Sequence, residues 1–426
     1  MGILRSFQIG VSGLQAAGSG MGVIGDNIAN AGTNGFKASR AEFQDVLAMS
    51  LKGISGGDQF GAGTKIAHIK PIMTQGDITR TESITDLAVN GNGYFVSEAP
   101  FGKGYTRDGS FHFDKEGNLI TGDGYRVLGF VANDDGEITN KVAPIKLGNT
   151  TIPAKATENL TFSMNLDSRE ENLVFNPEEP DKTSHFSSSV TVYDNVGTAR
   201  VVTQYYNKVD NNKWEYHSMV DGKDAQGGQD GKMVEMANGT LVFSDKGRLQ
   251  EEIEGNNSFN FNKGAAAGQK IKFDWGESIV EGGDGLSAST QCGSGSSVAR
   301  HTQDGSTAAT LASMSFSDAG ILTAVYNNGE DRNVAQIAIG KFENNEGLFK
   351  VGKNMFKESK NSGQGSVGKP GEAGRGEILA KSLELSNVDI ANEFVNLMTA
   401  QRNFQASAKT ITTSDQMLQE VLQLKR

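Results

Sequence analysis

The two ends of this 426-residue chain carry apolar residues at the alternating three- and four-residue spacing of helices that pack along one another. No Gly or Pro occurs from 383 to 426. We therefore predict paired helices over 1–30 and 383–426, with Ser386 or Asn387 capping the second. The first predicted seam comprises Leu4, Phe7, Val11, Leu14, Gly18, Met21, Gly25 and Ile28. The second comprises Phe394, Leu397, Gln401, Phe404, Ala408, Ile411, Asp415, Leu418 and Leu422.

The N-terminal segment has the wrong composition for a helix that stands alone in water. Residues 10–25 contain six glycines, and each costs about 1 kcal/mol relative to alanine inside a helix. Arg5 and Asp26 are the only charged residues from 1 to 30, whereas a solvated helix normally has a charged face. An intramolecular helical hairpin and a membrane-surface helix are the alternatives. The low charge favours self-assembly, in which neighbouring copies bury both ends.

A recurring turn pattern indicates β structure between the two ends. An aromatic residue is followed by a glycine four positions later and an apolar residue two beyond that. Such turns suit hairpins whose last loop residue has a positive φ. We therefore predict a mainly β fold of antiparallel barrels or sandwiches over 71–360, beside a coiled-coil-like axial domain of the paired terminal helices. The pattern occurs at Phe113-Gly117-Leu119, Phe243-Gly247-Leu249 and Phe316-Gly320-Leu322, and more loosely at Tyr193-Gly197-Ala199.

Two glycine-rich stretches separate the predicted helices from the predicted β region. Residues 53–63 hold five glycines and residues 361–376 hold six. Such composition is typical of flexible connectors. The predicted hinge residues are Gly53, Gly56, Gly57, Gly61 and Gly63.

Several classes of function find no support in the sequence. Forty basic and 51 acidic residues give a net charge of −11, which disfavours nucleic-acid binding. The single cysteine, Cys292, rules out intrachain disulfides and Cys-rich zinc sites, and we expect it to be a small buried hydrophobe. No dinucleotide fingerprint, Walker A loop, zinc-protease motif or calcium loop is present. We predict no catalytic residue, cofactor or metal and no enzyme activity, although a Ser-His-Asp triad, which needs no local motif, stays open.

The two ends also resemble a known family. Residues 12–16 and 21–37 are similar to the N-terminal signature of the bacterial flagellar rod and hook family, and 386–394, 401–406 and 409–413 are similar to its C-terminal signature. Segments 107–111 and 344–348 resemble hook segments. The signature residues are Asn27, Ile28, Ala29, Asn30, Gly35, Phe36, Ser386, Asn387, Val388, Asp389, Gln401 and Arg402.

The resemblance implies a domain organisation and a function. Residues 1–30 and 383–426 would form the axial helices, 31–70 and 361–382 the connectors, 71–145 and 306–360 an inner β domain, and 146–305 an outer β domain. The length and the β insertion favour a hook subunit that polymerises into a curved tube, transmits torque from rod to filament and encloses the export channel. A distal rod protein with a large insertion, or a secreted β-rich adhesin or enzyme, is the alternative.

The resemblance also implies partners and a location. The partners would be further copies of the chain, the rod, the hook cap, the hook–filament junction proteins and the export apparatus, with no nucleic acid and no membrane insertion. The subunit would be exported without a cleaved signal peptide to the extracellular part of the flagellum. Phe43 and Leu47 fit a Phe-x-x-x-apolar pattern for recognition at the export gate, for which an ordinary amphipathic turn is the alternative.

Overall fold

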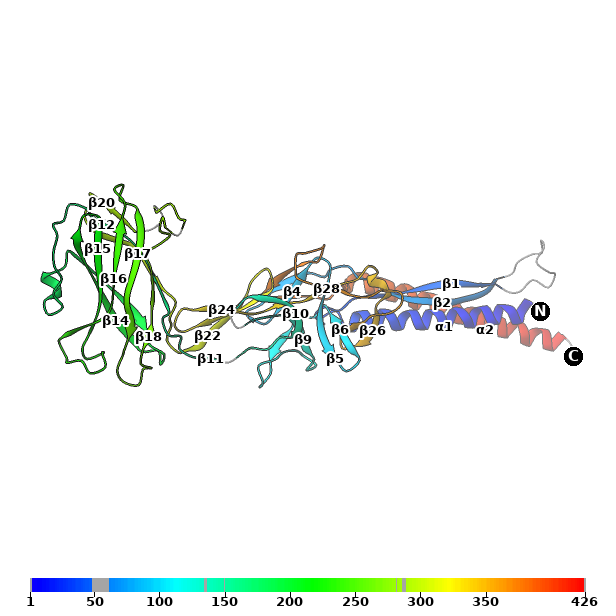
Figure 1. Cartoon of the computed structure of the whole chain (residues 1–426). Coiled ribbons are helices and arrows are strands. Elements are labelled where there is room, and N and C mark those ends of the chain that lie inside the picture. Colours follow the sequence, from blue (N-terminus) through cyan, green and yellow to red (C-terminus); the bar gives the residue numbers. More distant parts are fainter. Residues whose placement is uncertain are drawn as a thin grey trace. The chain divides into compact units, whose positions relative to one another are not determined.

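The computed structural model describes residues 2–47, 61–133, 136–148, 150–280, 282–285 and 289–424 (Figure 1). The chain divides into two compact units. Unit 1 comprises Met1–Gly148, Ser313–Val325 and Asp331–Arg426, and unit 2 comprises Asn149–Ala312 and Tyr326–Glu330. Unit 1 thus joins the predicted axial helices and inner β domain, and the predicted outer domain lies mostly in unit 2.

Unit 1 begins and ends with the predicted helices. Helix α1 spans Gly2–Ala29 and helix α2 spans Ile390–Leu424. The two helices lie side by side and run antiparallel, so the chain ends lie at the same end of the pair (Figure 1). Helix α2 starts later than predicted because Asp389, and not Ser386 or Asn387, caps it: its Oδ1 accepts hydrogen bonds from the amides of Ala391 at 2.9 Å and Asn392 at 3.2 Å.

A β-hairpin follows α1 where the sequence predicted a flexible connector. Strands β1 (Ser39–Leu47) and β2 (Gly61–Pro71) pair antiparallel, and the hairpin packs along α1 (Figure 1). The predicted hinge residues Gly53, Gly56 and Gly57 lie outside the described residues. Gly61 and Gly63 belong to β2 instead of a hinge, and a Cβ on Gly63 would come within 1.9 Å of the Ser12 Oγ in α1.

The rest of unit 1 is a β structure built from both halves of the chain. Its main sheet has the order β23-β24-β9-β5-β6-β27-β26. The core includes Phe95 and Phe111, whose rings meet edge to face with centroids 5.0 Å apart, and Ile378 from the C-terminal side. The first strands are β3 (Ile78–Arg80), β4 (Leu87–Asn90), β5 (Tyr94–Ala99), β6 (Gly102–Thr106), β7 (Phe111–Phe113), β8 (Leu119–Thr121), β9 (Arg126–Ala132) and β10 (Ile138–Pro144). The later elements are β22 (Ala309–Phe316), β23 (Ile321–Tyr326), β24 (Asp331–Ile337), β25 (Ile339–Lys341), the 3₁₀ turn Asn345–Gly347, β26 (Phe349–Gly352), β27 (Met355–Lys357), β28 (Ser366–Gly368), β29 (Glu377–Ala380) and β30 (Ser382–Glu384).

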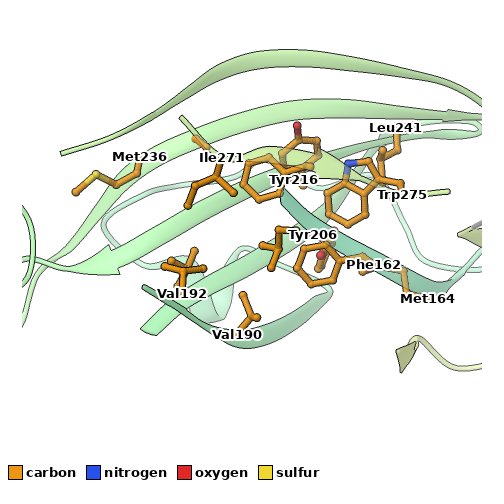
Figure 2. Packing of buried hydrophobic residues seen from close by; sticks show 14 of the residues in the cluster. Phe162, Met164, Val190, Val192, Tyr206, Tyr216, Met236, Leu241, Ile271 and Trp275 are labelled. Atoms are coloured by element: carbon orange, nitrogen blue, oxygen red, sulfur yellow. The ribbon is translucent and has the colours of Figure 1, made fainter. Parts of the chain in front are cut away.

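Unit 2 is a two-sheet β structure around an aromatic core. Strands β13 to β18 form an antiparallel meander, and β12 pairs with β19, β20 and β21 in a second sheet, parallel to the first two. In the core, the ring of Trp275 stacks on Phe162 with centroids 4.8 Å apart and also contacts Tyr206 and Tyr216 (Figure 2). The elements are β11 (Thr151–Ile152), β12 (Asn159–Asp167), the 3₁₀ turn Pro180–Lys182, β13 (Phe186–Tyr193), β14 (Ala199–Asp210), β15 (Lys213–Asp221), β16 (Met233–Phe243), β17 (Leu249–Phe259), β18 (Gln269–Lys270), β19 (Lys272–Asp274), β20 (Thr290–Cys292) and β21 (Ser297–Gln303).

The mainly β prediction and its hairpin turns are confirmed. Gly117, Gly197, Gly247 and Gly320 all have positive φ, between 70° and 85°. In each turn the glycine amide donates to the carbonyl three residues earlier. Cys292, by contrast, is exposed and not a buried hydrophobe. Within the described part of the chain, neither helix is long and apolar enough to cross a membrane.

Candidate functional site

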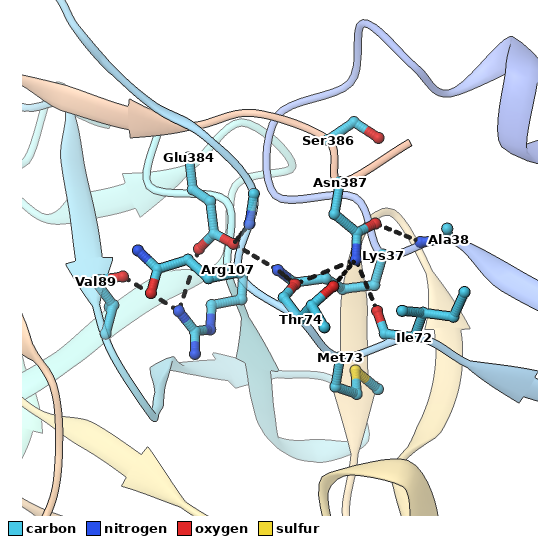
Figure 3. Close-up of polar contacts among 12 residues, drawn as sticks. Lys37, Ala38, Ile72, Met73, Thr74, Val89, Arg107, Glu384, Ser386 and Asn387 are labelled. Atoms are coloured by element: carbon cyan, nitrogen blue, oxygen red, sulfur yellow. Dashed lines mark hydrogen bonds and ion pairs between the residues drawn. The ribbon is translucent and has the colours of Figure 1, made fainter. Parts of the chain in front are cut away.

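Four chain segments meet at a buried junction in unit 1, between the two helices and the β structure (Figure 3). The segments are 35–38, which follows α1, 72–76, which follows β2, the turn around Arg107, and 384–387, which precedes α2. We call the charged group at its centre, Lys37, Arg107 and Glu384, the junction cluster.

The junction cluster is a buried ion triad centred on Glu384. The Lys37 Nζ donates to the Glu384 Oε1 at 2.5 Å and to the Thr74 carbonyl at 2.6 Å. The Arg107 Nη1 donates to the Glu384 Oε2 at 3.2 Å. Glu384 is fully buried, and Lys37 and Arg107 are at most 5% exposed. Burial lowers the pKa of Lys37, and the adjacent Glu384 carboxylate opposes that shift.

Two asparagines of the predicted signature tie the junction to the helices. The Asn27 side chain, in the last turn of α1, donates to the Ser39 carbonyl and accepts from the Ser39 amide, both at 2.8 Å. The Asn387 Oδ1 accepts from the Ala38 amide at 2.8 Å, and its Nδ2 donates to the Ile72 carbonyl at 2.9 Å (Figure 3). The bonds to Ser39 and Ala38 satisfy backbone groups of buried residues.

Gly35 and Phe36 complete the junction. Gly35 has a φ of 66°, and a Cβ on it would lie 2.4 Å from the Asp108 amide nitrogen, so only glycine fits. The Phe36 ring is buried under Lys350, whose Nζ lies 5.0 Å from the ring centroid and donates to the Lys37 carbonyl. Four of the signature residues, Asn27, Gly35, Phe36 and Asn387, therefore contact the junction directly.

The contact between the helices is made largely by small residues, most of which lie one position before the predicted seam residues. A Cβ on Gly10 would lie 2.9 Å from the Ile411 Cγ1, and one on Gly13 would lie 2.9 Å from the Ser407 Oγ. Ala17 and Ala400 line the groove between the helices further along. The predicted seam residue Ile411 lies at this contact. The other predicted seam residues Val11, Leu14, Met21, Ile28, Leu397, Phe404 and Leu418 are half-buried, whereas Phe7 and Phe394 are exposed. The side chains of Leu4 and Leu422 lie outside the described residues.

Both helices also present an uncovered face. On α1, no atom of the described residues lies within 4 Å of a Cβ built on Gly18, Gly22 or Gly25, beyond their chain neighbours and the helix's own backbone. On α2, Phe394, Val395 and Met398 are 49–55% exposed. The groove of about 370 Å³ between the helices is lined by other residues of α1 and α2, together with residues of β1 and Ile72. Gln401 and Arg402 are exposed on α2, as is Ala29 at the end of α1.

The remaining predicted residues are dispersed. Phe43 is half exposed in β1 and contacts Gly20 of α1, while the side chain of Leu47 lies outside the described residues. The predicted connector 361–382 instead contributes strands β28 and β29 and the start of β30. Among the described residues no group of three His, Cys, Asp or Glu side chains is placed to hold a metal ion.

Sequence reasoning gave no role to the junction cluster. Lys37 and Arg107 lie in segments that resemble the family, but nothing marked Glu384. In Ser382-Leu383-Glu384-Leu385 the charged residue alternates with apolar ones, which predicts Glu384 on the solvent side of a strand. The structure instead buries Glu384 and exposes Leu385.

The terminal helices pair with each other and are bonded to a β structure built from both halves of the chain. This arrangement defines a class of axial structural proteins with paired terminal helices. Four family models match consecutive parts of the chain. They are described as flagella basal body rod protein (7–37), flagellar hook protein FlgE/F/G D1 domain (88–165), flagellar basal body protein FlaE D2 domain (165–306) and flagellar basal body rod FlgEFG protein C-terminal (379–424).

Whole-chain relatives identify the family within that class. The flagellar hook protein FlgE of Borreliella burgdorferi is 34% identical, with 99% of this chain and all of the relative covered. That of Escherichia coli K12 is 30% identical over 99% of this chain and its own full length. The chain belongs to the flagellar hook protein FlgE family, which is a structural and not an enzyme family. A crystal structure of Helicobacter pylori FlgE2 shares the fold, with a TM-score of 0.53 and 15% identity over 72% of this chain and all of that one.

Proposed function

We propose that this chain is the subunit of a flagellar hook, in which copies polymerise through α1 and α2 into a curved tube around an export channel. The observation that carries the proposal is the uncovered face of each helix in the single chain. Half-exposed Phe394, Val395 and Met398 form a continuous apolar stretch of α2. Burying such side chains contributes roughly 25 cal/mol per Å² of apolar surface.

The glycines of α1 support a division between contacts within a copy and contacts between copies. Gly10, Gly13 and Gly20 face α2 or β1 of the same chain. Gly18, Gly22 and Gly25 recur at four- and three-residue spacing on a face left open by the described residues. An open glycine face permits close approach of another helix, and the apolar stretch of α2 from a neighbouring copy is the occupant that we propose.

The junction favours a different origin of bending from the glycine-rich hinges that the sequence predicted. The described parts of the two predicted connectors contain the paired strands β1, β2, β28 and β29, and the helix pair and this β structure belong to one compact unit. Bending then comes from sliding between copies through modest polar interfaces, while the clasped helix pairs resist twisting. Torque passes from the rod through the tube to the filament.

The remaining partners and the route of export rest on the family. The rod, the hook cap and the hook–filament junction proteins would contact the ends of the tube. The subunit would pass through the flagellar export apparatus without a cleaved signal peptide and act outside the cell. Exposed Phe43, with Leu47, remains our candidate for recognition at the export gate.

Electron microscopy of the purified full chain under polymerising conditions tests the proposal. Curved tubes are expected, whereas straight tubes would favour a distal rod protein, and no tubes would favour a secreted adhesin or enzyme. The matched variants are Val395→Asp and Val201→Asp, because both valines are 55% exposed and only the first lies on the helices. We expect Val395→Asp to abolish tubes and Val201→Asp to retain them. Normal tubes from Val395→Asp would remove the helix face from the interface.

A further inference from the structure

The segment 376–387 holds together parts of the chain that precede it by about 300 residues. Strand β29 is paired with β4, and β30 is paired with β3. In the described part of the chain β3 and β4 have no other strand partner. The Gly376 amide donates to the Asn92 carbonyl at 2.7 Å, and the Leu385 amide donates to the Asp77 carbonyl at 2.8 Å. Without this segment, strands β3 and β4 lose the backbone hydrogen bonds that they make to β30 and β29.

The same segment supplies the charge that neutralises the junction. Lys37 and Arg107 are buried, and Glu384 is the carboxylate bonded to both. The other acceptors of these two cations are the neutral carbonyls of Thr74, Val89 and Gly91. Removing one partner of a buried ion pair leaves an uncompensated buried charge, which is strongly destabilising.

The N-terminal side of the junction depends on the segment as well. The Gly35 amide donates to the Glu384 carbonyl at 2.7 Å, and the Ala38 amide donates to the Asn387 side chain at 2.8 Å. The Gly76 amide donates to the Glu384 Oε1 at 2.9 Å. The segment that follows α1 is therefore hydrogen-bonded to the segment that precedes α2.

We propose that residues 376–387 act as a latch. Helix α1 becomes fixed against the β structure only when Glu384 binds between Lys37 and Arg107. Until then the two cations have no counter-charge and the strands β3 and β4 have no partner. A chain whose C-terminal segment is undocked thus cannot present α1 in the orientation of the finished subunit. The latch goes beyond the proposed function because it concerns the order of folding within one molecule.

Hydrogen–deuterium exchange on the monomeric full chain tests the latch. The variant is Glu384→Gln, and the matched control is Glu377→Gln, an exposed carboxylate of the same segment. We expect Glu384→Gln to lower protection of residues 35–39 and 72–91 by about a hundred-fold or more, as loss of one partner of a buried ion pair implies. Protection of β13 to β15 in unit 2 should stay unchanged, and Glu377→Gln should match the parent protein.

A second variant separates a latch from simple misfolding. In Lys37→Met/Glu384→Gln one of the two uncompensated cations is removed, so protection of 35–39 should recover at least ten-fold relative to Glu384→Gln. Equal exchange in Glu384→Gln and Glu377→Gln would overturn the latch. So would a double variant that is no better protected than Glu384→Gln, including the case in which Glu384→Gln unfolds throughout. Because the measurement uses monomers, its result is independent of whether tubes form.

Discussion

Gly10 of α1 and Ile411 of α2 lie so close that a Cβ on the glycine would be 2.9 Å from the Ile411 Cγ1. Real Cβ atoms essentially never show so short a contact. The helix pair of one copy is therefore held at a separation that only glycine allows. A Cβ on Gly22 of the same helix would meet no described atom within 4 Å beyond its chain neighbours and the helix's own backbone.

We expect Gly10→Ala and Gly22→Ala to change the stability of the monomeric helix pair in opposite directions. Alanine favours a helix by about 1 kcal/mol over glycine, and Gly22→Ala should gain about that amount. In Gly10→Ala the forced shift of Ile411 should outweigh that gain and leave a net loss of about 1 kcal/mol. Thermal unfolding followed by far-ultraviolet circular dichroism measures both. Equal stabilisation by the two changes would mean that the helices do not touch at Gly10.

A larger side chain at the open position should act on assembly and not on the fold. We expect Gly22→Leu to leave the monomer folded, because the site is open, and to prevent tube formation, because it fills space reserved for a neighbouring copy. Sedimentation of polymer from monomer under polymerising conditions is the measurement. Thr191→Leu, at an exposed position of β13 in unit 2, serves as the control for added apolar surface. Pelleting of Gly22→Leu at the parent level would contradict the proposed face.

The buried Asn27 side chain should contribute more to the free energy of unfolding than the side chain of Asn30 at the same helix end. We expect Asn27→Ala to lower the free energy of unfolding by about 1–3 kcal/mol, because both backbone groups of Ser39 lose their buried partner. Asn30→Ala, whose half-buried side chain bonds to the nearby residues Asp26 and Thr33, should cost less than 1 kcal/mol. Chemical denaturation of the two variants provides the comparison, and equal losses would argue against a structural role for the Asn27–Ser39 pair.

Unit 2 should lose stability in acid through specific carboxylates. Hydrogen bonds from Arg169 hold the pKa of Asp167 at about 2. Burial alone would raise the pKa of Asp194, but bonds from the amides of Thr198 and Val196 and from Arg200 lower it. A lowered folded pKa adds stability that is present above the ordinary value near 4 and lost as the pH falls through the folded value.

The matching experiment is thermal unfolding of unit 2 between pH 5 and pH 2. The melting temperature of the parent protein should fall steadily over that window. Asp194→Asn should melt lower at pH 5 and depend less on pH, because it has one fewer of these carboxylates. An unchanged pH dependence in Asp194→Asn would show that its carboxylate is not among the responsible groups.

Local patterns in the sequence were enough for the β structure but not for the helix contact. A turn such as Asp114 to Asn118 is determined by its own residues, since Gly117 supplies the positive φ and Asp114 accepts the amides of Glu116 and Asn118. The helix seams were predicted from large apolar residues at heptad positions. The contact is instead centred on Gly10 and Gly13, one position earlier than Val11 and Leu14, because closely packed helices need small residues between them.

The junction cluster could not be predicted from the sequence for a different reason. Its members are separated by up to 347 positions, and nothing local marks which charged residues the fold will bury. The same holds for the predicted connectors. Their glycines suggest flexibility, yet Gly63 and Gly376 are needed because other chain segments pass against them. Glycine content alone does not distinguish a mobile linker from a close backbone contact.

Oxidative footprinting of Met398 tests most directly whether the outer face of α2 becomes buried between copies. Met398 is 51% exposed in the single chain, whereas Met219 in unit 2 is fully buried. With dilute hydrogen peroxide followed by mass spectrometry, we expect Met398 to form sulfoxide rapidly in monomers and at least ten-fold more slowly in assembled tubes, with Met219 slow in both. Equal oxidation of Met398 in monomers and in tubes would contradict the account.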